Sequence, residues 1–181
     1  MRMAAPVVER LGERAVRLGY LDLDGFVVVV SQTGPVLPNG VALTGTGVWD
    51  PTLTISSPAL EPDDSFAGRD PEAIGAELIG RGPGLTPEGD DVVAGMVGVL
   101  ATAGRHDEVA ALLGVDLRRR TTALSATLLE LAARGLGPEP LQAVLAGDAG
   151  ALPRLVAIGH TSGCAYARGA AVGLSMVRYR R

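Results

Sequence analysis

The pattern of apolar and polar positions divides this chain into a β-rich first third and a helical remainder. Phe26–Val30 is a run of apolar, mostly β-branched residues, and the turn-forming pair Asp24-Gly25 precedes it. Further short apolar runs lie at residues 41–44, 48–49 and 53–55, after a second turn signal at Leu37–Gly40. Such spacing is typical of antiparallel strands, and it predicts a β meander or barrel over roughly residues 15–57.

Beyond a polar, proline-containing connection at residues 58–71, apolar positions recur with helical spacing. The predicted helices cover residues 71–79, 90–103, 107–113, 116–134, 139–147, 150–158 and 162–178. Strands followed by helices indicate an α+β fold. We expect an N-terminal antiparallel β meander or barrel lobe (residues 1–66) and a C-terminal helical lobe (residues 67–181), together forming one compact unit.

Composition narrows the classes of protein that the chain can represent. Of its 181 residues 47% are hydrophobic but only 3% are aromatic, so the core must consist of Val, Leu, Ala and Gly. The net charge of −4 argues against a nucleic-acid partner. All sixteen cationic residues are arginines, which excludes sites that need a phosphate-binding or Schiff-base lysine.

Cysteine and histidine content and the N-terminal sequence narrow the classes further. Cys164 is the one cysteine, and the chain has two histidines, His106 and His160, so neither an internal disulfide nor a Cys/His zinc cluster is expected. Residues 1–10 lack the apolar core of a signal peptide, and no apolar run is long enough to cross a membrane. We therefore expect a cytoplasmic protein with no membrane partner.

The segment Gly80–Asp91 has the most unusual composition, with four glycines, two prolines, one arginine and three acids in twelve residues. Glycine-rich loops let a ligand approach the main chain, and the first turn of the following helix offers free N–H groups. We therefore predict a ligand-binding cradle, in which Arg81 can meet an anion. The groups that would form this cradle belong to Gly82, Gly84, Thr86 and Gly89.

Asp90 and Asp91 are the candidate catalytic residues, but at the start of a helix they compete with a bound anion. One resolution is a Mg²⁺ ion, with both aspartates as metal ligands, that bridges the carboxylates and a phosphate. Another is direct binding of ligand hydroxyl or amide groups by the two acids. A third interpretation is structural: Thr86 or Asp90 caps the helix and the glycines only turn the chain.

The segment Gly159–Gly163 is a second candidate for substrate binding. His160 can shuttle a proton there, and Thr161 and Ser162 offer hydroxyl and helix-start N–H groups. The alternative is an ordinary Ser/Thr helix cap beside a packed histidine.

A polar stripe on the helix predicted after Asp116 is a third candidate. Arg118, Thr121 or Thr122, and Ser125 fall on one face at spacings of three, four and seven residues. This face lines the same pocket, or it is simply the solvated side of a surface helix.

Glycines inside two of the predicted helices indicate how the segments meet. Gly95 and Gly98 lie in one helix and Gly169 and Gly173 in another, although glycine costs roughly 1 kcal/mol relative to alanine in a helix. The two helices are therefore expected to pack closely, with both preceding loops opening on the same side. The preceding segments Gly84–Pro87 and Gly159–Ser162 also resemble each other, either as an internal repeat or by chance in a chain rich in glycine and alanine.

The ten residues Gly82–Asp91, with Gly95 beyond them, resemble the signature of the AllH-like family, whose usual form is Gly-x-Gly-Leu-Thr-Pro-Ser-Gly-Asp-Asp. Glu88 stands where serine is common. The later segments 121–125, 132–135 and 159–163 fit the family in order, so the resemblance spans most of the chain. It implies a relation to a subunit of bacterial oxamate carbamoyltransferase in purine-nitrogen catabolism.

The resemblance implies a small anion such as oxamate or carbamoyl phosphate as ligand, and a chain that works with partner subunits or as a homo-oligomer. The leading hypothesis is a ligand-binding subunit with carbamoyl-type group transfer through positioning and electrostatic stabilisation. Two alternatives remain open: a non-catalytic module that stabilises a partner enzyme, and a Mg²⁺-dependent hydrolase.

Overall fold

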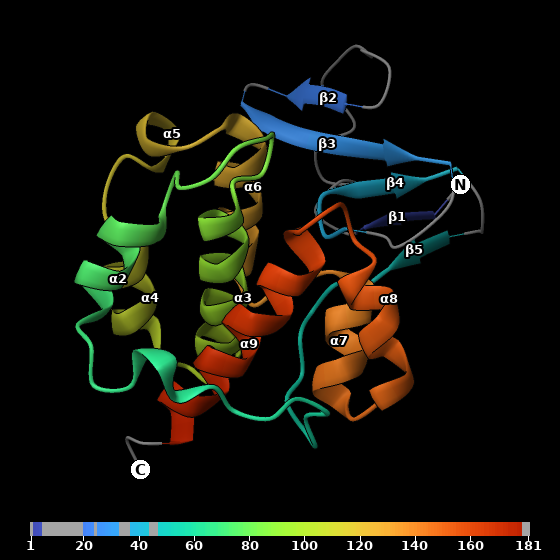
Figure 1. Ribbon diagram of the computed structural model, residues 1–181. Helices are drawn as coiled ribbons and strands as arrows, with labels where there is room; N and C mark the ends of the chain where they lie inside the picture. Colours follow the sequence, from blue (N-terminus) through green and yellow to red (C-terminus); the bar gives the residue numbers. More distant parts are fainter. Residues whose placement is uncertain (1, 5–19, 24, 33–36, 44–46, 179–181) are drawn as a thin grey trace.

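The computed structural model describes residues 2–4, 20–23, 25–32, 37–43 and 47–178, and strands precede helices along the chain (Figure 1). The fold is α+β, as expected. The strands are β1 (Arg2–Ala4), β2 (Tyr20–Leu23), β3 (Phe26–Ser31), β4 (Gly40–Ala42) and β5 (Gly47–Trp49). They form a single five-stranded sheet in the order β2-β3-β4-β1-β5.

The sheet is mixed and open, so the prediction of an antiparallel meander or barrel was wrong in its topology. Strands β2 and β3 form the predicted antiparallel hairpin, although Asp24 of its turn lies outside the described residues. Strand β4, however, runs parallel to β3, and β1 inserts between β4 and β5, antiparallel to the first and parallel to the second. Residues 53–55 form no strand; nearby, Thr52 makes an isolated bridge to Leu136.

The helical part follows the predicted order closely. Its helices are α2 (Pro71–Leu78), α3 (Glu88–Thr102), α4 (His106–Leu113), α5 (Leu117–Arg120), α6 (Ala123–Ala132), α7 (Glu139–Ala146), α8 (Leu152–Val156) and α9 (Ser162–Arg178). Short 3₁₀ turns cover Asp64–Phe66 and Ala149–Ala151. None of the helices in the described part of the chain combines the length and the apolarity that a bilayer span requires.

The single helix predicted over residues 116–134 is two helices, α5 and α6. Thr121 adopts an extended backbone with φ −145°, which ends α5. Thr122 then begins α6 as its N-cap, because its hydroxyl accepts a hydrogen bond from the N–H of Ser125 at 3.1 Å. Asp116, the predicted cap, has a left-handed backbone and makes no side-chain capping bond.

Helix α3 is the centre of the fold, and every residue from Gly89 to Leu100 is buried. A helix that is apolar on all sides requires neighbours on all sides. Helices α6 and α9 lie beside it, and all three run in the same direction (Figure 1). At the C-terminal ends of α3 and α6, Gly135 approaches Thr102, whereas Thr121 meets Asp90 at the N-terminal ends.

Glycines let α3 and α9 approach to backbone contact, as predicted. A Cβ on Gly169 would lie 1.9 Å from the carbonyl oxygen of Val92, and one on Gly95 would lie 2.3 Å from that of Tyr166. Gly173 faces Met96 in the same way, with 3.0 Å to its carbonyl oxygen. From Val92 and Gly169 to Met96 and Gly173 the contacts advance together along both helices, so α3 and α9 run in the same direction and their N-termini share one end.

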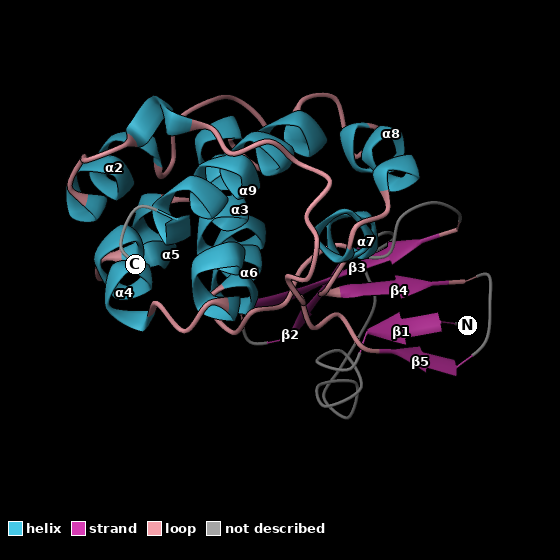
Figure 2. Ribbon diagram, turned by 90° about the horizontal axis from the view of Figure 1, so that it is seen from below, coloured by secondary structure: helices cyan, strands magenta, loops and turns pink. Residues whose placement is uncertain are grey.

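The sheet packs on the α6 side of this bundle, while α2 and α4 lie on the other side (Figure 2). Val27 of β3 is buried against Leu124 and Leu128 of α6. The sheet therefore supports α6, and α6 in turn lies against α3.

We expect Gly169→Ala to lower the free energy of unfolding. The added Cβ would force the α3 and α9 backbones apart, and overpacking costs about 1–3 kcal/mol, more than the roughly 1 kcal/mol that alanine gains over glycine in a helix. Denaturant unfolding measures the change. Gly98→Ala is the matched control, because its Cβ would meet only the tip of Leu53, at 3.0 Å, among described residues. Equal stability of the Gly169→Ala variant and the parent would contradict the packing argument.

Candidate functional site

The N-terminal ends of α3, α6 and α9 meet beneath the glycine-rich loop, residues 80–87. Two hydroxyl contacts hold this loop in place. Thr122 at the start of α6 donates to the carbonyl oxygen of Leu85 at 2.5 Å. On the other side, the hydroxyl of Thr86 lies 3.0 Å from that of Ser162, the first residue of α9. Three segments far apart in the sequence are therefore brought together here.

Asp90 is buried at this junction, and both of its carboxylate oxygens are engaged. Oδ1 accepts a hydrogen bond from the N–H of Gly80 at 2.7 Å, and Oδ2 accepts one from the hydroxyl of Thr121. Asp90 thereby ties the first turn of α3 to the loop on one side and to the α5–α6 break on the other. These contacts give Asp90 a structural role, which is to hold the three segments together.

Asp91 has a different environment, although it is equally buried at 2% exposure. Its Oδ2 is fully enclosed and has no hydrogen-bond partner within the described residues. Burial raises the pKa of Asp91 from its ordinary 3.8 to about 7; the neighbouring Asp90 and Glu88 carboxylates add to the increase, and the Ser162 and Thr86 hydroxyls oppose it. A carboxyl group that titrates near neutrality with an unused oxygen is a candidate for ligand contact or proton transfer.

Hydrogen bonds from the Ser162 and Thr86 hydroxyls, together with the positive ends of two helices, help Asp91 to remain buried without a cationic partner. Asp91 lies in the first turn of α3, and the parallel helix α9 begins beside it at Ser162. Unsatisfied N–H groups at helix N-termini carry partial positive charge and stabilise anions. This field favours the Asp91 carboxylate, and it equally favours an external anion.

Ser125 and Tyr166 complete the set of buried polar groups. Ser125, in the first turn of α6, is 1% exposed, and its hydroxyl has no hydrogen-bond partner among the described residues. Tyr166 is buried one helical turn after Ser162, and burial, followed by the charges of Asp91 and Asp90, raises the pKa of its phenol well above 10.0. Tyr166 was not among the predicted site residues, although its spacing of four residues from Ser162 places both on one face of a helix.

The remaining loop residues have distinct surroundings. Arg81 is exposed, while Gly89 is buried and its N–H already donates to the Arg81 carbonyl at 2.9 Å. A Cβ on Gly89 would lie 2.0 Å from the carbonyl oxygen of Leu78, so this glycine permits close packing of α3 on the end of α2. Gly82 and Gly84 are exposed with φ of +116° and +99°, and the space that a Gly84 Cβ would enter is open.

The predicted residues before α9 lie at the surface. His160 and Thr161 are both exposed, and the Thr161 carbonyl accepts the N–H of Ala165 at 3.0 Å, as at the start of a regular helix. Ser162 is thus the member of this segment that the structure connects directly to the glycine-rich loop.

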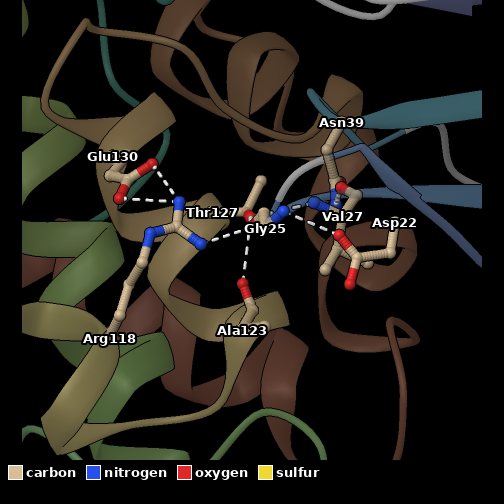
Figure 3. A network of polar contacts seen from close by, with 8 residues as sticks. All are labelled: Asp22, Gly25, Val27, Asn39, Arg118, Ala123, Thr127 and Glu130. Carbon is tan, nitrogen blue, oxygen red and sulfur yellow. Dashed lines mark hydrogen bonds and ion pairs between the residues drawn. The ribbon is translucent and has the colours of Figure 1, made fainter. Parts of the chain in front are cut away.

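Arg118 is directed away from this junction. Its guanidinium donates to both carboxylate oxygens of Glu130, at 2.8 and 2.9 Å, and to the carbonyl of Gly25 in the β2–β3 turn (Figure 3). Thr127 of α6 reaches the same turn, since its hydroxyl lies 3.4 Å from the Gly25 carbonyl oxygen, and it also accepts the N–H of Val27 in β3 at 3.1 Å. Arg118 therefore joins the sheet to the helices, and the expectation that it shares a face with Thr121 fails because the helix breaks between them.

A groove of about 360 Å³ runs along the outer side of the loop, between the glycines Gly80, Gly82 and Gly84 and the segment Arg119–Thr122. It gives small molecules access to the loop backbone. We call it the Arg119 groove.

A metal centre would depend on very few side chains. Within the described residues, no group of three or more His, Cys, Asp or Glu side chains is placed to hold a metal ion. Asp90 and Asp91 remain the candidate protein ligands, and the binding of Mg²⁺ stays a prediction.

The sequence model of the family described as oxamate carbamoyltransferase subunit AllH matches residues 78–174, which is more than half of the chain. The matched region begins just before the glycine-rich loop and extends through most of α9. No curated protein and no solved structure matches the chain.

We expect Asp91→Asn to raise the melting temperature at pH 8. Because the pKa of Asp91 is about 7 in the folded chain and near 3.8 in the unfolded chain, the folded state loses stability as the pH rises between these values. The neutral amide avoids this loss, which corresponds to at most a few kcal/mol.

Thermal unfolding at pH 5 and pH 8 measures this effect. The advantage of the Asp91→Asn variant should shrink as the pH falls toward 5, where the wild-type carboxyl group is protonated too. Asp107→Asn, at an exposed position of α4, is the control and should respond little. An identical effect of Asp91→Asn at both pH values would show that Asp91 is not the titrating group.

Proposed function

The chain belongs to the AllH family of oxamate carbamoyltransferase subunits, and from this premise we propose that it binds the small ligand of that enzyme at the junction of α3, α6 and α9. Membership links the chain to oxamate carbamoyltransferase. The observation that carries the proposal is the buried Asp91 oxygen without a partner, placed where two helix N-termini meet.

A ligand with both an amide and an oxyanion matches this junction. Asp91, as a carboxylate, can accept a hydrogen bond from an amide N–H through Oδ2. At the start of α3 the N–H groups of Gly89, Asp90 and Asp91 already donate to carbonyl oxygens. The N–H of Glu88 on α3, and those of Ser162 and Cys164 on α9, make no hydrogen bond to another described residue and can donate to a carboxylate or phosphate. Oxamate and carbamoyl phosphate each combine these two kinds of group in one small molecule.

Ser125 strengthens this interpretation. A buried hydroxyl without a partner costs about 1–3 kcal/mol, so a ligand that supplies the missing hydrogen bond recovers that free energy. Two such groups on neighbouring helices, Asp91 on α3 and Ser125 on α6, favour a polar ligand over an apolar one.

The catalytic contribution of the chain would be positioning and electrostatics. Asp90 holds the loop against the helix ends through Gly80 and Thr121. A carbamoyl carbon held in this way is oriented for attack, and the helix ends stabilise negative charge that develops on its oxygen. Asp91 titrates in the range where a carboxyl group can also move a proton. Partner subunits, or further copies of this chain, would complete the enzyme.

Leu85 favours a second candidate function, that of a module which stabilises a partner enzyme. Its side chain is 61% exposed although Thr122 fixes its carbonyl oxygen. An apolar side chain held rigidly at the surface suits a protein contact.

A thermal-shift panel of oxamate, carbamoyl phosphate and phosphate separates the two functions, since a ligand at 100 times its Kd stabilises by about 2.7 kcal/mol. If none of these ligands raised the melting temperature of the folded protein, the result would favour a module that stabilises a partner enzyme.

The third possibility, a Mg²⁺-dependent hydrolase, makes a separate prediction. Stabilisation by Mg²⁺ should then disappear in Asp91→Ala, because that variant removes one of the two candidate ligands. Full retention of the Mg²⁺ response in Asp91→Ala would eliminate the hydrolase interpretation.

We expect Asp91→Asn to weaken oxamate binding by roughly tenfold or more, because hydrogen bonds to charged groups contribute about 1.5–3 kcal/mol. Isothermal titration calorimetry measures the Kd. Ser125→Ala should have a smaller effect in the same direction. Asp107→Asn, which leaves the junction intact, should bind oxamate like the parent chain.

The pH dependence of the Kd tests the role of Asp91 independently. The amide of the ligand needs the ionised carboxylate as its acceptor, so binding should tighten as the pH rises through about 7. This trend should be absent in Asp91→Asn. Tighter binding at low pH, or an unchanged Kd in Asp91→Asn, would overturn the proposed contact.

A further inference from the structure

We propose that the Arg119 groove is a subsite for a phosphate group, separate from the amide-binding position at Asp91. The inference rests on the proposed function and adds to it the location of the second half of the ligand. Asp91 and the groove lie on different sides of the same loop: Thr86 faces Ser162 on one side, and Thr122 and Arg119 border the groove on the other.

The groove is cationic in a chain whose net charge is −4. Arg119 and Arg120 both line it, and no acidic side chain is among its described lining residues. The Asp90 carboxylate accepts hydrogen bonds at both of its oxygens, and the exposed Glu88 lies beside Gly82 at the edge of the groove. An anion that enters the groove therefore meets positive charge and hydrogen-bond donors.

Arg119 is the cation that is free to move toward a ligand. Its side chain is 85% exposed, and its ion pair with Asp116 has a long N–O distance of 4.0 Å. Exposed pairs of this kind contribute little to stability, so releasing it costs little. Arg120 differs, since its guanidinium donates to the carbonyls of Leu113 and Gly75 at 3.1 and 2.8 Å and is fixed by them.

The loop contributes backbone donors on the opposite wall. The N–H groups of Gly82 and Gly84 make no hydrogen bond to another described residue, and both glycines line the groove. No protein atom lies within 4 Å of the position that a Cβ of Gly84 would take. Bare backbone N–H groups opposite an arginine suit a tetrahedral oxyanion, which accepts hydrogen bonds from several directions.

Titration with inorganic phosphate at constant ionic strength tests the subsite. We expect saturable binding to the wild-type chain, and binding roughly tenfold weaker in Arg119→Gln, the loss expected for one charge-assisted hydrogen bond. Arg134→Gln, which removes another exposed arginine, beyond the C-terminal end of α6, is the matched control and should bind phosphate like the parent.

Asp91→Asn separates this proposal from the function on which it rests. That variant should lose affinity for oxamate but keep its affinity for phosphate. Arg119→Gln should instead lose affinity for phosphate. Absence of saturable phosphate binding, or an equal loss in Arg119→Gln and Arg134→Gln, would overturn the subsite while leaving the Asp91 contact intact. If Asp91→Asn bound oxamate as tightly as the parent while Arg119→Gln still weakened phosphate binding, only the amide contact would be overturned.

Discussion

The structure depends on the burial of two adjacent carboxylates at the common N-terminal end of three parallel helices. Asp90 satisfies its charge with a backbone N–H and a threonine hydroxyl, and so holds the loop in place. Asp91 has the hydroxyls of Ser162 and Thr86 beside it, but one of its oxygens is enclosed without a hydrogen-bond partner among the described residues. One carboxylate therefore holds the junction together, and the other keeps an unused acceptor inside it.

Glycine makes this arrangement possible. Three helices can present their N-termini to one small space only if their axes are close, and α3 and α9 achieve this through backbone contacts at Gly95 and Gly169. A tighter junction excludes water from Asp91, and this loss of hydration raises the pKa of its carboxyl group. The close packing of the helices and the raised pKa of Asp91 are thus two results of the same geometry.

Local signals in the sequence predicted much of the junction. The glycine-rich loop, the glycines inside two helices and the hydroxyls of Thr86 and Ser162 are short-range features, and the structure brings them together. The sheet was less predictable, because the position of β1 between β4 and β5 depends on pairing between distant segments. The break at Thr121 also escaped prediction, since leucine spacing continues across it and only the threonine cap marks the new helix.

The contact between α3 and α9 has a consequence for how such a chain can diverge. Where side chains interdigitate, a substitution on one helix can be compensated by a smaller or larger residue on its neighbour. At Gly169 the facing atom is the main-chain oxygen of Val92, which every amino acid possesses. A second substitution therefore cannot compensate at this point, and Gly169 should change more slowly than its surroundings although it is not a proposed ligand contact.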